Sequence, residues 1–344
     1  MTIGRIAFLG SGETSLAGGR IFEALARFIS DPIRVSIMET PAGFELNASL
    51  VAGRVAEFLK TRLQNYKPVI DLIPARKQGT EFSPDNPEIL KPLLTSNMIF
   101  MGPGSPTYVA RQLRGTLAWD IIRARHRLGA TLVFSSAATI SIGAWALPVY
   151  EIYKVGEEVH MKDGLNLFAD FGMDLTFIPH WNNAEGGIDL DTSRCFMGIE
   201  RFNQWRKMLP VGSTILGLDE HSGMVMDFEK NICEVHGVSS ITILKDADES
   251  MHSSGSVFSL NTLGEFKSPQ PIENGIRLEA WDLIAHASSA DEETPPDEAL
   301  ELLELRKAAR IRKDFAESDR LRDQLATLGW LVKDTKEGQQ LSKS

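Results

Sequence analysis

The first 135 residues alternate between short, almost wholly apolar runs and amphipathic segments of helical length. The apolar runs predict strands over residues 5–10, 33–38, 69–74, 97–102 and 131–135. The segments between them predict helices over residues 19–29, 50–63, 86–94 (cut short by Pro92) and 108–128. Strands that are apolar on both faces and alternate with helices are typical of a parallel sheet covered on both sides. The sequence therefore predicts a three-layer α/β/α fold.

Glycine-rich and polar loops follow these strands at one edge of the predicted sheet. They are Gly10-Ser-Gly-Glu-Thr14, Glu39-Thr-Pro-Ala-Gly43, Gly102-Pro-Gly-Ser-Pro106 and Ser135-Ser136. Ligands of parallel sheets bind beyond the carboxyl ends of the strands, and glycine lets the backbone approach a ligand closely. Any one of these loops is simply a good turn, but four of them at one edge favour a site.

Ser136 follows the apolar run 131–135 and precedes small residues suited to a helix. A sharp turn from strand to helix exposes a serine hydroxyl, and the next N–H groups then point to where an oxyanion forms. Such a serine needs a base and an acid. His180 and His221 follow short strands predicted at residues 176–179 and 214–218, and the candidate acids are Asp219, Glu220 and Glu151.

The rest of the chain changes in character after residue 150. We predict a helix over residues 195–209, a hairpin formed by residues 224–227 and 233–235, and an irregular segment over 247–296. The predicted organisation is a hydrolase domain over 1–246, a linker over 247–297 and a helical appendage over 298–344.

Bulk properties narrow the classes of function. The net charge of −10 argues against a general binder of nucleic acid or anionic membranes. The N-terminus has no signal-peptide pattern and no apolar run is long enough to span a membrane, so we expect a cytoplasmic protein. Cys195 and Cys233 are too few for a metal cluster or disulfide framework. No metal or organic cofactor is expected.

Five motifs in order resemble the cyanophycinase and aspartyl dipeptidase (peptidase E) family, over roughly residues 3–245. They are Gly10-Ser-Gly-Glu-Thr14, Met101-Gly-Pro-Gly-Ser105, Phe134-Ser-Ser136-Ala-Ala138, Ile178-Pro-His180 and Gly217-Leu-Asp-Glu-His221. These are serine peptidases, so the resemblance implies a flavodoxin-like, class I glutamine-amidotransferase-like fold with a mostly parallel sheet. Glutaminases of that fold use a cysteine where this chain has a serine, which disfavours that activity.

The resemblance also implies roles for single residues. Ser136 is the nucleophile and His180 the base. The orienting acid is Glu220 by analogy with cyanophycinases, or Glu151 by analogy with dipeptidases, and the sequence does not decide between them. The oxyanion donors are the N–H groups of Ala137 and Gly104, because Pro103 has none.

The chain departs from the family pattern at two places. Phe134 and Ala138 replace the glycines that flank the serine, so the turn must be wider, strained or inactive. The segment Asn182-Asn-Ala-Glu-Gly-Gly187 lacks the arginines that bind substrate in cyanophycinases. Remaining candidates for contacts with the substrate are Glu13, Arg194 and Arg201.

Residues 300–338 resemble the C-terminal end of cysteinyl-tRNA synthetases. Leu321, Leu325 and Leu328 share a helix face before Gly329, which predicts two short helices and a small β unit. Synthetase catalytic motifs are absent from the sequence. With nine Lys/Arg against eight Asp/Glu, this tail is expected to bind nucleic acid weakly. Docking on the main domain, on a partner or on a second copy in a homodimer stays open.

Together these features predict a serine hydrolase that cleaves an amide or isopeptide bond of a small acidic peptide. The alternative is a catalytically silent binding protein of the same fold, whose tail engages RNA or a protein.

Overall fold

The computed structural model describes residues 3–269, 275–291, 295–335 and 338–343. The chain divides into two compact units, Met1–Ile284 and Ala285–Ser344, which are described separately below. Part of the acidic linker predicted from the sequence, residues 292–294, lies outside the described residues.

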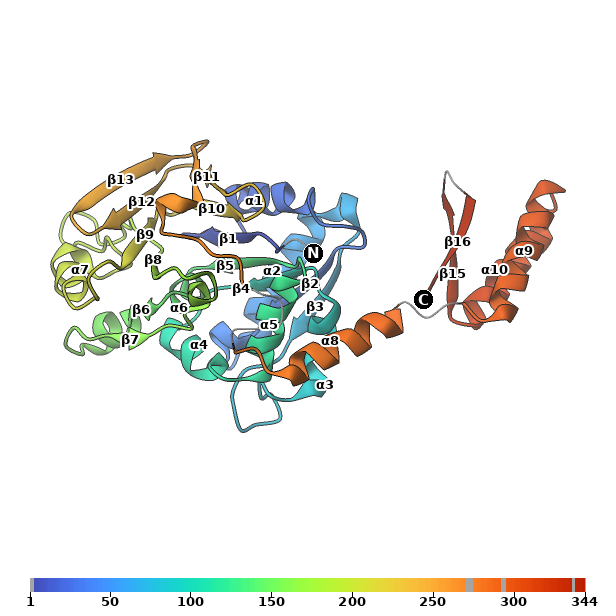
Figure 1. Ribbon diagram of the computed structural model, residues 1–344, viewed down its shortest axis with the longest axis horizontal. Coiled ribbons are helices and arrows are strands. Elements are labelled where there is room, and N and C mark those ends of the chain that lie inside the picture. Colours follow the sequence, from blue (N-terminus) through green and yellow to red (C-terminus); the bar gives the residue numbers. More distant parts are fainter. Residues whose placement is uncertain (1–2, 270–274, 292–294, 336–337, 344) are drawn as a thin grey trace. The chain divides into compact units, whose positions relative to one another are not determined.

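A mixed sheet forms the centre of the first unit (Figure 1). Its order in the described residues is β14-β11-β10-β1-β5-β4-β2-β3. The five strands from β1 to β3 are parallel, whereas β10, β11 and β14 are added antiparallel at the β1 edge. The strand bounds are Ile6–Leu9 (β1), Arg34–Met38 (β2), Val69–Ile73 (β3), Met98–Met101 (β4), Thr131–Ser135 (β5), Ser222–Asp227 (β10), Ile232–Gly237 (β11) and Val257–Ser259 (β14).

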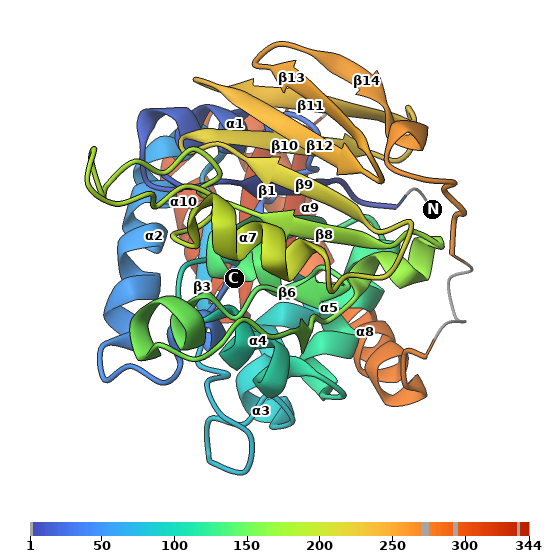
Figure 2. The ribbon, with the colours of Figure 1, turned by 90° about the vertical axis from the view of Figure 1, so that its left-hand side faces the viewer.

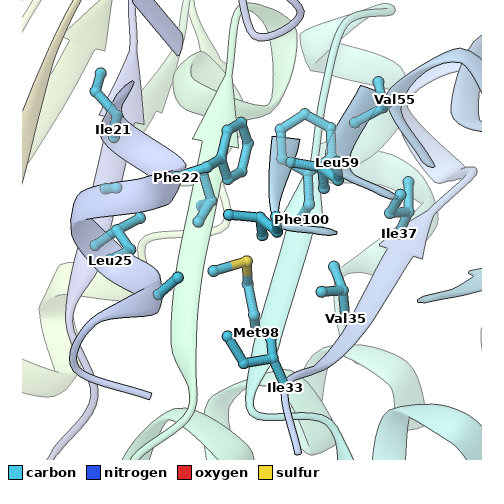
Figure 3. Close-up of a cluster of buried hydrophobic side chains, with 14 of the residues drawn as sticks. Ile21, Phe22, Leu25, Ile33, Val35, Ile37, Val55, Leu59, Met98 and Phe100 are labelled. Carbon is cyan, nitrogen blue, oxygen red and sulfur yellow. The ribbon is translucent and has the colours of Figure 1, made fainter. Parts of the chain in front are cut away.

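Helices cover the parallel part of this sheet. They are Leu16–Ala26 (α1), Ala48–Arg62 (α2), Pro87–Leu90 (α3), Pro106–Leu113 (α4), Leu117–Arg127 (α5) and Ala137–Ser141 (α6). The helix Gly198–Arg206 (α7) packs instead on a second sheet, through contacts with Ile178 and Ile215. Figure 3 shows the core on one face, where α1 and α2 pack on β2 and β4 through Phe22, Leu59, Val35 and Phe100. On the opposite face, Phe8 of β1 stacks on Phe177 with ring centroids 4.5 Å apart. Both faces are buried, so the three-layer, mostly parallel fold class is as predicted.

A second sheet, of order β13-β12-β9-β8, lies beside the first (Figure 2). Its strands are Leu175–Ile178 (β8), Thr214–Leu218 (β9), Ser240–Lys245 (β12) and Asp248–Ser253 (β13). β8 and β9 are parallel, with Ile178 opposite Gly217, so both strands deliver their following residues to the same edge. Smaller elements are the strand pair Trp145–Ala146 (β6) and Lys162–Asp163 (β7), and short 3₁₀ or π turns at Thr40–Ala42, Gln64–Tyr66, Lys91–Thr95, Tyr150–Val155, Leu167–Phe171 and Leu260–Thr262.

Three elements differ from the sequence prediction. The single helix expected over 108–128 is two helices, because Gly115 adopts a left-handed φ of 69° and the Thr116 hydroxyl caps α5. The helix expected from residue 195 begins at Gly198, because the three residues from Arg194 to Phe196 have positive φ. The segment expected to be irregular contains β13, β14 and α8, Leu278–Asp291. β13 was not predicted because most of its side chains are exposed, so its sequence shows no alternation of apolar and polar residues.

The second unit has the two helices and the small β unit expected from its sequence. Helices Asp297–Ile311 (α9) and Phe315–Thr327 (α10) precede the hairpin of Trp330–Thr335 (β15) and Gly338–Lys343 (β16). Asp314 caps α10 by accepting from the N–H of Glu317. Ala299, Leu325 and Trp330 form its small core. Among the described helices of the whole chain, none has the length and apolar character needed to cross a membrane.

His126 of α5 is a buried histidine that makes stability depend on pH. Its Nε2 lies 2.8 Å from the Gly4 carbonyl oxygen, and its ring packs edge-on against Phe171 and Phe228. Burial lowers the pKa of His126 to about 4, against a usual 6.5. The unfolded chain therefore takes up this proton first as the pH falls. Above about pH 6.5 the titration of His126 does not lower the free energy of unfolding. As the pH falls towards 4, it lowers this free energy by about 3 kcal/mol.

We predict that His126→Gln, which keeps a donor for Gly4 but does not titrate, flattens the loss of stability between pH 7 and pH 4. Urea unfolding of both proteins at pH 7, 5.5 and 4 measures this. The variant is expected to be less stable at pH 7, and the difference between the two proteins is expected to shrink as the pH falls. A difference that stays constant with pH would contradict the prediction.

Candidate active site

Ser136 sits on a sharp, strained turn between β5 and α6. Its φ of 51° and ψ of −117° lie in a region that residues with a side chain rarely adopt. Two backbone hydrogen bonds hold the turn, from Ser136 N–H to the Leu9 oxygen and from Ala138 N–H to the Gly102 oxygen, each 3.3 Å. The hydroxyl is thereby presented beyond the carboxyl end of the parallel sheet.

Phe134 and Ala138 are accommodated in this turn although the family pattern has glycine at both positions. The Phe134 ring is fully buried on β5 and stacks on Phe8, with ring centroids 6.2 Å apart. Ala138 is also fully buried, in the first turn of α6. The turn is therefore strained, which is one of the outcomes that the sequence left open.

His180 and Glu220 follow the parallel strands β8 and β9 and meet Ser136 at the same edge. The Ser136 Oγ atom lies 2.9 Å from His180 Nε2, and His180 Nδ1 lies 2.9 Å from Glu220 Oε1. Because a carboxylate only accepts, Nδ1 carries the proton and Nε2 is free to accept from the serine hydroxyl. Both side chains are partly exposed, 18% for His180 and 28% for Glu220.

Two asparagines hold Glu220 in place. The Asn183 side-chain amide donates to Glu220 Oε1 at 2.9 Å, and Asn182 Oδ1 accepts from the Glu220 N–H at 2.8 Å. Burial raises the pKa of Glu220, but the hydrogen bonds from Asn183 and His180 and the nearby imidazoles outweigh it and leave the pKa below its usual value. Glu220 is therefore charged at neutral pH.

Glu151, the alternative acid, lies in the π turn Tyr150–Val155 and points elsewhere. Its Oε1 accepts a hydrogen bond from the Thr107 hydroxyl. Its Oε2 is buried without a hydrogen-bond partner in the described part of the chain. The Nδ1 atom of His180 is thus hydrogen-bonded to Glu220 and not to Glu151.

The first loop of the sheet, Gly10-Ser-Gly-Glu-Thr14, contacts all three segments. The Gly10 oxygen accepts from the His180 N–H at 3.2 Å, and the Ser11 hydroxyl oxygen accepts from the His221 N–H at 3.0 Å. Glu13 Oε2 accepts from the hydroxyl of Ser135, the residue before the serine on the turn, at 2.9 Å. This loop therefore couples the positions of the serine, histidine and glutamate segments.

A pocket of about 230 Å³ opens beside Ser136 and His180. Its other lining residues are Gly104, Pro106, Ala137, Ile140, Val149, Tyr150, Tyr153, Lys154, Glu185, Cys195 and Phe196. No sequence motif of known role marks the loops that carry Tyr150, Tyr153, Lys154 and Glu185, so these pocket residues could not be predicted. Arg194 and Arg201 are absent from this lining. Arg194 stacks over the Trp181 ring and bonds its carbonyl, and Arg201 bonds the Met197 carbonyl.

Two backbone N–H groups in the pocket wall fit the role of oxyanion donors. Those of Gly104 and Ala137 donate to no acceptor within the described residues. Gly104 has a φ of 151°, and a Cβ atom there would lie 1.8 Å from the Pro41 oxygen. Only glycine fits this position.

We predict that Gly104→Ala slows acylation of Ser136 by about 100-fold, because the loop must move and displace one oxyanion donor. The rate of labelling by a fluorophosphonate measures this without a known substrate. Gly53→Ala on α2 is the matched control, since a Cβ there meets nothing within 4 Å. Equal labelling rates for the two variants would exclude Gly104 from the oxyanion site.

Neither cysteine is a nucleophile in this arrangement. Both are free and buried. Burial, together with the charge of Glu220, raises the pKa of Cys195 to about 12. Among the described residues, no group of three or more His, Cys, Asp or Glu side chains is arranged to hold a metal ion.

Two solved structures that align with this chain are described as a peptidase and a putative peptidase E. A crystal structure of a peptidase from an acI-B1 Actinobacterium aligns with a TM-score of 0.60 and 21% sequence identity, covering 75% of this chain and 97% of that one. A putative peptidase E from Listeria monocytogenes EGD-e aligns with a TM-score of 0.43 and 14% identity, covering 73% and 98%. At 21% identity and a TM-score of 0.60, the first alignment shows that the two chains share a fold.

The tail matches a different family. Residues 294–341 match the cysteinyl-tRNA ligase anticodon binding domain. The cysteine–tRNA ligase of Caldicellulosiruptor saccharolyticus is 49% identical over 60 residues, which are 17% of this chain and 13% of the ligase. That of Methanosarcina acetivorans is 40% identical over 63 residues, 18% of this chain and 13% of the ligase. The chain thus combines a unit with the fold of a solved peptidase and a segment similar to the anticodon binding domain of cysteinyl-tRNA ligases.

Proposed function

We propose that the protein is a serine-type peptidase that cleaves an amide or isopeptide bond of a small peptide through Ser136, His180 and Glu220. The observation that carries the proposal is the continuous chain of hydrogen-bonding atoms from Ser136 Oγ through both nitrogens of His180 to Glu220, with 2.9 Å at each step. A serine held at a strained turn and bonded to an oriented imidazole is the arrangement that activates a hydroxyl.

In the reaction, Ser136 Oγ attacks the scissile carbonyl carbon while its proton passes to His180 Nε2. The N–H groups of Gly104 and Ala137 stabilise the negative oxygen of the tetrahedral intermediate. The C–N bond then breaks, and His180 gives its proton to the departing amine. A water molecule that gives its proton to His180 attacks the acyl carbon, the bond from that carbon to Oγ breaks, and Ser136 Oγ takes the proton back from His180. Glu220 keeps the proton on Nδ1 and stabilises the imidazolium.

The size and charge of the pocket support a small substrate with a carboxylate. The pocket holds about 230 Å³, and its lining includes one lysine, Lys154, and one glutamate, Glu185. Lys154 thus takes the role that the sequence predicted for Arg194 or Arg201, which do not line the pocket. Lys154 is exposed and its ammonium nitrogen lies 5.0 Å from the centroid of the Tyr153 ring, where it can meet a carboxylate of a short peptide.

A defined library of dipeptides and isopeptides tests the proposal. Wild-type protein is expected to release new amino groups from a subset of the library, detected by mass spectrometry, and the Ser136→Ala variant to release none. Equal release by both proteins would reject Ser136 as the nucleophile. A folded protein that cleaves nothing and gives no serine adduct would favour the silent binding protein of the same fold.

We further propose that the second unit binds tRNA, because residues 294–341 match an anticodon binding domain. Phe315 is 62% exposed at the start of α10, and exposed aromatic rings beside arginines stack on unpaired bases. Fluorescence anisotropy of full-length protein with a cysteine tRNA tests this. Phe315→Ala is expected to weaken binding about tenfold, whereas Leu331→Ala, half-exposed on β15, leaves it unchanged. Equal affinity of both variants would contradict the proposal.

The cytoplasmic location and a dimer contact through the tail stay predictions from the sequence.

A further inference from the structure

The inner wall of the pocket beside Ser136 is apolar. Ile140, Val149 and Cys195 line it and are each at most 7% exposed. The rings of Tyr153 and Phe196 complete the wall, with centroids 5.5 Å apart. Ile140, Val149 and Phe196 offer no hydrogen-bond partner to a group that enters, so the polar atoms of this wall are the Tyr153 hydroxyl and the Cys195 thiol.

The charged residues of the lining lie elsewhere. Lys154 and Glu185 are both exposed, and Lys154 Nζ lies 5.0 Å from the centroid of the Tyr153 ring, so Tyr153 stands where the wall meets the mouth of the pocket. Arg194, the nearest arginine in sequence to the wall, faces Trp181 instead, with its guanidinium carbon 3.8 Å from the ring centroid. A carboxylate placed against Ile140, Val149 and Cys195 would lose its hydration, and none of these side chains offers it a positive charge.

The backbone holds this wall in place. Arg194, Cys195 and Phe196 have consecutive φ values of 57°, 59° and 65°, an uncommon left-handed run. The Cys195 N–H donates to the His180 carbonyl at 3.1 Å, and the Phe196 ring lies 5.7 Å from the His180 imidazole. The wall residues Cys195 and Phe196 therefore contact the proposed base directly, so the pocket is already formed before a ligand binds.

We infer that this pocket selects a short peptide by an aliphatic or aromatic side chain, and that Lys154 and Glu185 bind the peptide's charged groups at the mouth. The inference rests on the proposed function and narrows its substrate class. An acidic side chain is excluded from the inner wall, and the carboxylate that Lys154 meets is one that stays at the solvent edge, such as the peptide's C-terminus.

Matched dipeptides test the inference in two ways. For wild-type protein, kcat/KM is compared for Leu-Ala, Phe-Ala, Asp-Ala and Glu-Ala and for the reversed sequences. We compare peptides within whichever sequence order, Xaa-Ala or Ala-Xaa, the protein cleaves. In that order, kcat/KM for the Leu and Phe peptides is expected to exceed kcat/KM for the Asp and Glu peptides by at least tenfold. The same peptides are titrated calorimetrically into the Ser136→Ala variant, which reports binding whether or not turnover occurs. The apolar members are expected to bind at least tenfold more tightly.

A charge placed in the wall supplies the converse test. Tyr153 is half-buried, so Tyr153→Arg adds a cation without creating a cavity. This variant is expected to lose at least tenfold in kcat/KM for Leu-Ala and to gain for Asp-Ala. Tyr66→Arg, at an equally half-buried tyrosine outside the pocket lining, is the matched control and should keep the wild-type preference. Thermal unfolding of both variants checks that they fold.

The outcomes separate this inference from the proposed function. If a serine adduct forms but Asp and Glu peptides are cleaved or bound as well as the apolar ones, the inference is overturned and the peptidase proposal stands. If no adduct forms but the Ser136→Ala variant binds apolar peptides preferentially, the pocket assignment stands and the peptidase proposal fails.

Discussion

Replacing Ser136 by alanine is expected to lower kcat for amide hydrolysis by about 10⁴-fold or more, which is the effect of removing the nucleophile of a serine triad. The loss should appear in kcat, because the pocket that binds the substrate is left unchanged. Alanine keeps the Cβ atom and the backbone of the turn, and Ser136 is only partly buried. The thermal midpoint of unfolding should therefore shift by no more than about 2 °C.

Ser141→Ala is the matched control for this experiment. Ser141 is a fully buried serine on α6, and its hydroxyl donates to the Ala138 carbonyl within the same helix. Its replacement removes a hydroxyl near the site without touching His180, so turnover should stay within a few-fold of wild type. Comparable losses in the two variants would show that activity follows the packing of α6 and not the Ser136 nucleophile.

Glu220→Gln is expected to reduce kcat by about 10³–10⁴-fold, whereas Glu151→Gln reduces it by less than tenfold. The reason is the hydrogen bond between His180 Nδ1 and Glu220 Oε1. A glutamine that turns its NH₂ group to Nδ1 forces the proton onto Nε2, and that tautomer cannot accept from the Ser136 hydroxyl. Glu151 instead accepts a hydrogen bond from the Thr107 hydroxyl, so its replacement leaves the His180 imidazole in place.

The two glutamine variants are compared by kcat and by the pH dependence of kcat/KM. Because the pKa of Glu220 is held below its usual value, its own protonation should not limit wild-type activity above about pH 5. A large loss in Glu151→Gln with little loss in Glu220→Gln would reverse the assignment. It would indicate that the imidazole turns toward Glu151 when substrate binds.

The architecture could be predicted because buried parallel strands are apolar on both faces and therefore stand out in the sequence. The break between α4 and α5 could not, because Gly115 and Thr116 sit inside an amphipathic pattern that continues on both sides. β13 was not predicted, because a strand whose side chains are mostly exposed has no apolar pattern in the sequence.

For the site, the sequence identified the serine turn and both candidate acids but could not choose between them. Glu151 and Glu220 are both at plausible positions, and the choice depends on β8 and β9 being parallel neighbours, a long-range pairing. The pocket wall depends on tertiary contacts in the same way. Tyr153 and Cys195 are 42 residues apart in the chain and share the wall because both pack in one cluster with Ile140 of α6.

The central claim is that Ser136 is an activated nucleophile, and intact-mass analysis after treatment with a fluorophosphonate tests it most directly. The account predicts a single adduct on wild-type protein and none on Ser136→Ala or on protein unfolded before treatment. A folded wild-type protein that takes up no reagent, or an adduct that persists in Ser136→Ala, would contradict it.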